Sequence, residues 1–202
     1  MFDIFERVFS CDLGNAMPSL AAERDPEAQL ARQFGGCTFE RGLYRILRPI
    51  DVSIVKELVD AAFPSLAERT RPFSTDWLGR IFATDSGRMD DGRPMVLMLE
   101  PGTGETLEIP ATIESFHDSE LIEYKDAALA SNFYEAWLNC GGCSPETTQC
   151  VGYKVPLFLG GTDEVSNLQT VDLSVYWTLT AQLLARARGL QIGARIVTVE
   201  IR

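Results

Sequence analysis

One stretch near the C-terminal end, residues 150–184, constrains the fold most, because its signals for local structure follow one another closely. An apolar run at residues 155–159 indicates a short strand, which Gly160-Gly161 would end in a turn. A polar segment follows, and Asp172 then stands where an N-cap residue precedes a helix. Apolar side chains from Leu173 to Ala187 recur at the spacing of one helix face. The sequence therefore predicts a compact unit of strand, turn and capped helix.

The composition limits the classes of function that are open to the chain. Of its 202 residues, 46% are hydrophobic, which is enough for one sizeable core or two small ones. The formal net charge of -11 argues against direct binding to nucleic acid or to an anionic membrane, because both require clustered lysine and arginine. An acidic surface suits a basic partner, although such a charge also serves ordinary solubility.

The predicted location follows from the absence of targeting signals. No apolar run approaches the ~20 residues that a membrane-spanning helix needs. Residues 1–10 are amphipathic and lack the basic start and continuous apolar block of a signal peptide. We therefore expect a cytoplasmic protein in which the five cysteines remain reduced thiols.

The pattern along the chain predicts an α+β fold, in which helices flank an antiparallel sheet and a mostly helical C-terminal part packs against it. Asp25-Pro26 and Asp51 are expected to begin two helices. Other helices are expected at the N-terminus, from Ser119 to Gly141, and from Asp172 to a stop at Gly189. Predicted strands occupy residues 43–47, 76–83, 95–99, 106–109 and 196–201, with tight turns at Asp91-Gly92 and residues 100–104.

The change of period from strand to helix near Phe116–Asp118 predicts a division into two domains. The first would be an α+β domain at residues 1–117, and the second a mainly helical domain at residues 118–202. No flexible linker separates them, so we expect the two to pack closely.

Cysteine and histidine offer a weak case for metal or redox chemistry. Cys140 and Cys143 have the C-x-x-C spacing, Cys150 follows nearby, and His117 is the single histidine. A structural zinc site usually draws its ligands from two close pairs, and the second pair is missing. The cysteine pair also follows a predicted helix C-terminus, where the dipole disfavours a thiolate. We therefore predict free thiols, a packing role for His117 and no metal, while a metal-stabilised adaptor stays an alternative.

Other signals for catalysis are also weak. No serine or cysteine nucleophile stands in a recognisable elbow to act with His117, and the glycine-rich residues 100–105 lack the Lys-Ser/Thr ending of a phosphate loop. Carboxylates in turns are usually solvated, although a small carboxylate-dependent enzyme or ligand-binding domain with a pocket near Gly160-Gly161 stays an alternative. Core packing is the default for the large aromatic residues, and one or two could be interface anchors instead: Trp77, Trp137, Tyr176 and Trp177. We predict no catalytic residue and no cofactor.

The chain resembles a family of bacterial immunity proteins that protect against type VI secretion DNase toxins. The run CVGYKVPLFLGGTDEVSNLQTVDLSVYW is similar to the C-terminal signature of that family. The part before it resembles the GAD-like domain that precedes this signature. The matching segments are FGGCTFERGLYRIL, FSTDWLGRIFATD, MVLMLEPGTGETLEIP and FHDSELIEYKDAALASNFYEAWL, so the resemblance covers the chain from about Gly35 to Leu184.

The resemblance implies a binding protein without catalysis, which meets a cognate DNase toxin in the cytoplasm and occludes or distorts its active site. Direct contact with nucleic acid or a membrane is not expected, and we expect a monomer when the protein is free. The acidic composition fits such a partner, because a DNase needs a basic surface for phosphates. We predict partner contacts from acidic and aromatic turns: Asp85, Asp90, Asp91, Tyr153, Asp163, Glu164 and Asn167. For Asn167 and Gly160-Gly161, turn formation is the preferred alternative.

Overall fold

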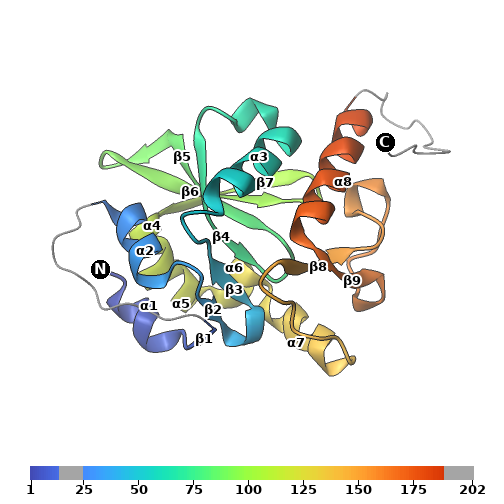
Figure 1. The fold of residues 1–202 in the computed structure, drawn as a ribbon, viewed down its shortest axis with the longest axis horizontal. Helices are drawn as coiled ribbons and strands as arrows, with labels where there is room; N and C mark the ends of the chain where they lie inside the picture. Colours follow the sequence, from blue (N-terminus) through green and yellow to red (C-terminus); the bar gives the residue numbers. More distant parts are fainter. Residues whose placement is uncertain (14–24, 189–202) are drawn as a thin grey trace.

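A seven-stranded antiparallel sheet forms the centre of the molecule, whose computed structural model describes residues 1–13 and 25–188 (Figure 1). The strands lie side by side in chain order, each paired antiparallel with the next. They are β1 (Cys11–Leu13), β2 (Thr38–Phe39), β3 (Tyr44–Ile46), β4 (Thr70–Asp76), β5 (Ile81–Asp90), β6 (Arg93–Glu100) and β7 (Glu105–Thr112). The predicted α+β class and antiparallel sheet are confirmed.

Helices cover both faces of this sheet, and a second small sheet follows them. The helices are α1 (Asp3–Val8), α2 (Pro26–Phe34), α3 (Val52–Ala62), α4 (Ile113–Ser115), α5 (Leu121–Glu123), α6 (Lys125–Leu129), α7 (Ser131–Asn139) and α8 (Leu173–Ala187), with a π-helical turn η3 (Phe116–Glu120) between α4 and α5. The short 3-10 turns are η1 (Glu40–Gly42), η2 (Pro64–Leu66), η4 (Leu157–Leu159) and η5 (Val165–Asn167). The two-stranded sheet pairs β8 (Gln149–Tyr153) with β9 (Leu168–Asp172). No helix of the described residues is long and apolar enough to cross a membrane.

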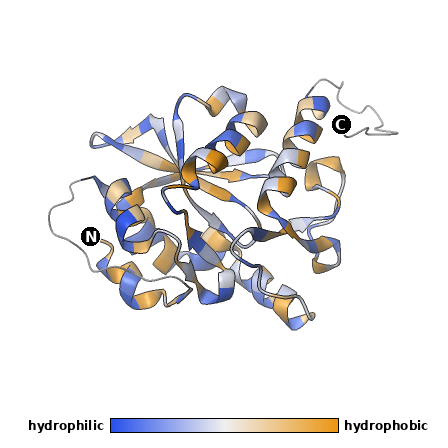
Figure 2. Cartoon of the chain, in the orientation of Figure 1, coloured by the Kyte–Doolittle hydropathy of each residue, from blue (hydrophilic) through white to orange (hydrophobic). Residues whose placement is uncertain are grey.

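Alternating side chains divide the core into two clusters, one on each face of the sheet. On β5, Phe82 packs with α1, α2 and the helices that follow β7, whereas Ile81 and Ala83 pack with α3 and α8. On β6, Met98 joins the first cluster and Leu99 the second. This alternation is the period of a strand that is buried on both sides. Figure 2 shows hydrophobic residues along the central strands and mixed colours on the surrounding helices.

Local signals placed three helix starts correctly, and side-chain caps are present at two of them. The Asp25 side chain accepts a hydrogen bond from the backbone nitrogen of Glu27 at the start of α2. The Asp172 side chain accepts from the nitrogens of Ser174 and Val175 at the start of α8. Asp51 also stands directly before its predicted helix, α3, but its side chain makes no capping bond there and instead forms an ion pair with Arg48.

The strand predicted at residues 76–83 is wrong. Asp76 ends β4, residues 77–80 form a turn, and Ile81 begins β5. The Asp76 carboxylate accepts from the backbone nitrogen of Arg80 at 3.0 Å, and Gly79 has a φ of +74°. A side-chain hydrogen bond and a left-handed glycine therefore produce a tight reversal where the apolar alternation predicted continuous strand.

The single helix predicted from Ser119 to Gly141 is interrupted. Tyr124 leaves helical geometry with a ψ of 36°, and Ala130 is left-handed with a φ of 50°. The Asp126 carboxylate accepts from the backbone nitrogen of Asn132 at 2.7 Å, so it stabilises the break between α6 and α7. The helical period continues through these breaks, which is why it did not reveal them.

The strand predicted at residues 155–159 is also wrong, because this segment ends in the 3-10 turn η4. The real strand, β8, lies just before it, and Pro156 has no N–H with which to extend a ladder. The strand predicted at residues 196–201 and the helix stop at Gly189 lie outside the described residues.

Residues from both sides of the predicted boundary at Phe116–Asp118 contribute to each buried cluster. The first cluster contains Tyr44 and Tyr134, and the second contains Ile81 and Trp177. The division into domains at residues 1–117 and 118–202 stays a prediction.

Candidate functional site

One buried amide closes the loop between β8 and β9, residues 154–167. The Asn167 side chain accepts a hydrogen bond from the Val155 nitrogen at 3.0 Å and donates to the carbonyl oxygens of Val155 and Thr162 at 2.9 Å. Asn167 is only 8% exposed. A Cβ at Gly161 would lie 1.9 Å from the Val155 oxygen, so the same turn requires a glycine there. Turn formation is thus the observed role of both residues.

Tyr153 orients Asp163 within this loop. Its hydroxyl donates to Asp163 Oδ1 at 2.6 Å, and its ring is buried. Burial, together with the adjacent carboxylate, raises the pKa of the Tyr153 hydroxyl, which therefore remains a hydrogen-bond donor at neutral pH. Asp163 and Glu164 are exposed. The loop consequently presents two carboxylates to solvent, one of them held by a buried side chain.

The turn between β6 and β7 packs against this loop. The Leu157 nitrogen donates to the Gly102 oxygen at 2.9 Å. A Cβ on Gly102 would lie 2.6 Å from the Tyr153 ring, so the turn approaches Tyr153 more closely than any larger residue would allow. The central sheet and the β8–β9 loop are therefore in direct contact.

A buried charge network lies next to this contact. Arg80 Nε donates to Asp76 Oδ2 at 2.6 Å and lies 3.7 Å from Glu100 Oε2. Burial raises the pKa of Glu100 to about 7, although Arg80 opposes the shift. Burial also raises the pKa of Asp76. Two carboxylates thus share one guanidinium in a site with little access to water.

A carboxyl group with a pKa near neutrality is suited to general acid–base chemistry, but its surroundings here are packed. The Glu100 side chain accepts a hydrogen bond from the Gly102 nitrogen at 3.0 Å and is 15% exposed. A groove beside α3 and a cleft beside α7 are both lined by residues other than Glu100, Gly160 and Gly161. The arrangement is that of an ionic network which fixes the β6–β7 turn.

The other three predicted contact residues belong to the β5–β6 hairpin. Asp85 is fully buried and forms an ion pair with Arg69, which lowers the pKa of Asp85 through its hydrogen bonds. Asp90 and Asp91 are exposed at the tip, where Asp91 and Gly92 both have positive φ.

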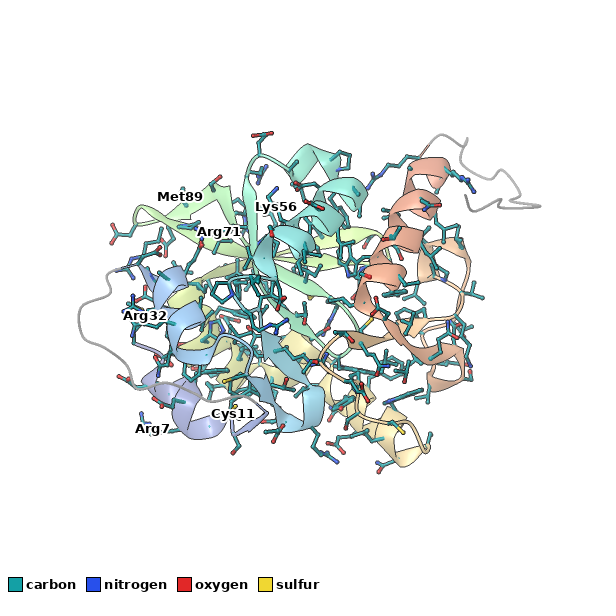
Figure 3. The ribbon with its side chains drawn as sticks, viewed as in Figure 1. Arg7, Cys11, Arg32, Lys56, Arg71 and Met89 are labelled. Atoms are coloured by element: carbon teal, nitrogen blue, oxygen red, sulfur yellow. The ribbon has the colours of Figure 1, made fainter. Side chains whose placement is uncertain are left out.

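This tip lies on the opposite side of the molecule from β8, β9 and α8. The label of Met89, one residue before Asp90, marks the hairpin at the left of Figure 3. Tyr153, Asp163, Glu164 and Asn167 therefore lie together at the end of β8 and in the loop that follows it. The β5–β6 hairpin, which carries Asp90 and Asp91 at its tip, extends on the other side of the molecule (Figure 1).

The residues considered for metal or redox chemistry do not form a site. Cys140 and Cys143 are exposed, whereas Cys150 is buried, and burial raises the pKa of its thiol. His117 is fully buried between the Tyr44 hydroxyl and the Ile113 carbonyl oxygen, at 3.0 and 2.7 Å. Within residues 1–13 and 25–188, no group of three or more His, Cys, Asp and Glu side chains is placed to hold a metal ion.

Of the four large aromatic residues, three belong to the core. Trp77 and Trp177 have no exposed surface and Tyr176 has 6%. Trp137 is partly exposed, and its Nε1 donates to the Cys143 oxygen at 2.9 Å. Trp137 is the one member of this set with surface available to a partner.

The buried network of Asp76, Arg80 and Glu100 was not predicted from the sequence. The signal that was present is Asp76 followed closely by Gly79, because aspartate and glycine are both typical of turns. The assignment of this segment to a strand concealed it.

Comparison with known proteins supplies a family for the C-terminal part. Residues 112–184 match the family model described as T6SS immunity protein Tdi1, C-terminal. Among solved structures, the crystal structure of Atu4351 from Agrobacterium tumefaciens is similar with a TM-score of 0.59 and 17% sequence identity, over 90% of this chain and 89% of that chain. At this identity the likeness shows a shared fold. No curated protein matches the sequence. The matched residues 112–184 contain β8, β9, their loop and α8, so this part of the chain is similar to the Tdi1 C-terminal domains of type VI secretion immunity proteins.

Proposed function

We propose that this protein is a non-catalytic immunity protein that binds and neutralises a cognate type VI secretion DNase toxin in the cytoplasm. The observation that carries the proposal is the family match of residues 112–184, whose description names an immunity protein. The earlier segments that resemble a GAD-like domain add support from the sequence alone. The proposed mode of action is occlusion or distortion of the toxin's active site.

Charge complementarity supports a nuclease as the partner. The chain carries a net charge of -11, and a DNase needs basic side chains to contact phosphates. Opposite potentials would raise the rate of association and orient the two proteins before contact.

The geometry refines the proposed contact residues. Asp163, Glu164, Asp90 and Asp91 are exposed and available to a partner, whereas Asp85 and Asn167 are buried and shape the backbone. We propose the β8–β9 loop as the main contact surface, because it lies within the matched residues and Tyr153 holds one of its carboxylates in place.

Co-purification with a nuclease encoded beside this gene tests the proposal. The purified nuclease would then be assayed for DNA degradation at increasing concentrations of this protein. We expect protection to be complete near one equivalent. A matched amount of an unrelated protein of similar negative charge serves as the control for non-specific electrostatic inhibition. Failure to bind or protect at concentrations on the order of 1 μM would contradict the proposal.

A further inference from the structure

A groove of about 340 Å³ lies between α3, the start of α8 and the face of the central sheet. Its volume is in the range of sites that hold small ligands. Its position is distinct from the β8–β9 loop, because none of residues 153–167 lines it. The groove is therefore a candidate binding site separate from the proposed toxin contact surface.

Strand register places three polar side chains on the floor of this groove. Arg45 of β3 is paired with Thr38 of β2 on one side and with Thr75 of β4 on the other. Directly paired residues of neighbouring strands project from the same face of a sheet. All three line the groove.

Arg45, which lines the groove, has one hydrogen-bond donor without a partner. The residue is only 6% exposed, and its terminal nitrogens donate to the carbonyl oxygens of Gln149, at 2.7 Å, and Pro145. Its Nε is buried and has no hydrogen-bond partner. A buried charged group without full hydrogen bonding is unfavourable, so an acceptor at this position would be stabilising.

The Arg45 charge also lacks a directly bound carboxylate. Among the described residues no ion pair joins Arg45 to an acidic side chain. Burial lowers the pKa of Arg45, and the nearby Asp76 carboxylate, which opposes this shift, is hydrogen-bonded by Arg80.

The other charged side chains of the lining are Arg48, Asp51 and Asp172, and each already has a partner or hydrogen bonds within the protein. Arg48 forms its ion pair with Asp51, and Asp172 Oδ1 accepts hydrogen bonds from Ser174 and Val175. Of the two arginines in the lining, Arg45 is therefore the one whose buried Nε–H has no hydrogen-bond acceptor.

The wall on the α3 side is apolar. It consists of Ile54, Val55 and Leu58, and Leu173 lies across from them. Ile54 is 56% exposed, so the apolar wall continues to the surface. An apolar wall next to a buried cation matches a ligand that has a hydrocarbon body and one negative end.

We propose that this groove binds a small organic carboxylate, with one oxygen accepting the Arg45 Nε–H and the hydrocarbon body lying against Ile54, Val55 and Leu58. Nuclear magnetic resonance titration of the full chain with hexanoate tests the proposal. We expect saturable shifts of the Thr38, Thr75 and Ser174 amides. Hexan-1-ol has the same body without the charge and should bind about tenfold more weakly, because a charge-assisted hydrogen bond is lost. Inorganic phosphate has no apolar body and should also bind more weakly.

Two substitutions test whether the amide chemical-shift changes come from binding in this groove. Leu58→Trp adds bulk to the apolar wall while Arg45 is kept, and it should weaken hexanoate binding by at least about tenfold. Leu107→Trp is the matched control, because Leu107 is an exposed residue of β7 outside the groove lining, and it should leave binding unchanged. Arg45→Met should also abolish binding, but Arg45 holds Pro145 and Gln149, so the Leu58 variant decides if that protein does not fold.

Three results would overturn the proposal. They are an absence of saturable binding up to concentrations on the order of 10 mM, equal affinity for hexanoate and hexan-1-ol, and unchanged hexanoate binding by the folded Leu58→Trp protein.

Discussion

The indole Nε1 of Trp177 donates a hydrogen bond of 2.7 Å to the carbonyl oxygen of Gly79, a residue 98 positions earlier in the chain. Trp177 has no exposed surface, so this bond lies inside the core between α8 and the β4–β5 turn. The Val151 nitrogen donates to the Trp77 oxygen at the same turn. The matched C-terminal residues are thus joined to the central sheet at residues 77–79.

Gly79→Ala should destabilise the protein by about 2–4 kcal/mol, because it combines left-handed strain with a steric conflict. Gly79 has a φ of +74°, and an added Cβ would lie 2.8 Å from Cys150 Sγ. Gly92→Ala is a matched control with a φ of +75° and no atom within 4 Å of the added Cβ. It should cost about 1 kcal/mol. Urea unfolding measures both values, and equal losses would show that Cys150 moves aside.

Glu100→Gln should change how stability depends on pH. The folded-state pKa of Glu100 is about 7, above its ordinary value of 4.5. The stabilisation that Glu100 adds to the folded state is therefore complete below pH 4.5. It is lost as the pH rises through 7, which lowers the free energy of unfolding by up to about 3 kcal/mol. Urea unfolding between pH 5 and pH 8 should show a smaller decline for Glu100→Gln than for the natural protein. Parallel profiles would contradict the assignment.

The effect of His117 on the pH dependence of stability should have the opposite sign. Burial lowers its folded-state pKa from 6.5 to about 4. Its contribution is complete above pH 6.5 and is lost as the pH falls toward 4, because the unfolded chain takes up a proton first. In His117→Gln, the free energy of unfolding should fall less between pH 6.5 and pH 4.5 than in the natural protein. An unchanged slope would mean that His117 is protonated in the folded state.

Arg69→Met should destabilise the protein by about 2–4 kcal/mol, because it leaves the fully buried Asp85 carboxylate without its ion pair. Arg71→Met is the control. Arg71 is 68% exposed, and its contact with Glu27 is 3.2 Å. An exposed ion pair of this kind contributes about 0–1 kcal/mol. If both variants unfold at the same urea concentration, the Asp85 carboxylate is hydrated after Arg69 is removed.

The two exposed acidic surfaces can be compared by charge removal. Asp163→Asn with Glu164→Gln should slow association with the toxin by about tenfold at low salt, because electrostatic steering is lost. Asp90→Asn with Asp91→Asn removes the same charge from the hairpin tip. Stopped-flow association at two salt concentrations measures both pairs. A larger effect of the hairpin pair would move the proposed interface to the β5–β6 tip.

Signals within a few residues predicted the local structure well. Asp172 and Asp25 capped their helices as expected, because the hydrogen bonds of a cap reach only two or three residues along the chain. Asp91-Gly92 likewise formed the predicted hairpin turn. The exposed carboxylates of residues 163–164 were also visible as a polar turn.

Features that depend on distant residues were missed. Ala130 adopts a left-handed backbone at the break that Asp126 stabilises, although alanine usually favours a helix. The groove floor requires the register of Thr38, Arg45 and Thr75, which periodicity within one strand does not contain. Similarly, the acidic hairpin tip and the β8–β9 loop could each be found in the sequence. The sequence did not show that they lie far apart in the folded protein.

The position of α8 late in the chain determines when the apolar face of the sheet becomes covered during synthesis. All seven strands of the main sheet are complete by Thr112, whereas Trp177 and Leu184 cover one of its apolar faces from a helix made much later. Until the ribosome has released α8, residues such as Ile81 and Leu99 lack part of their cover. We therefore expect the nascent sheet to expose apolar surface until α8 packs on it, and truncation before Leu173 to leave that surface uncovered.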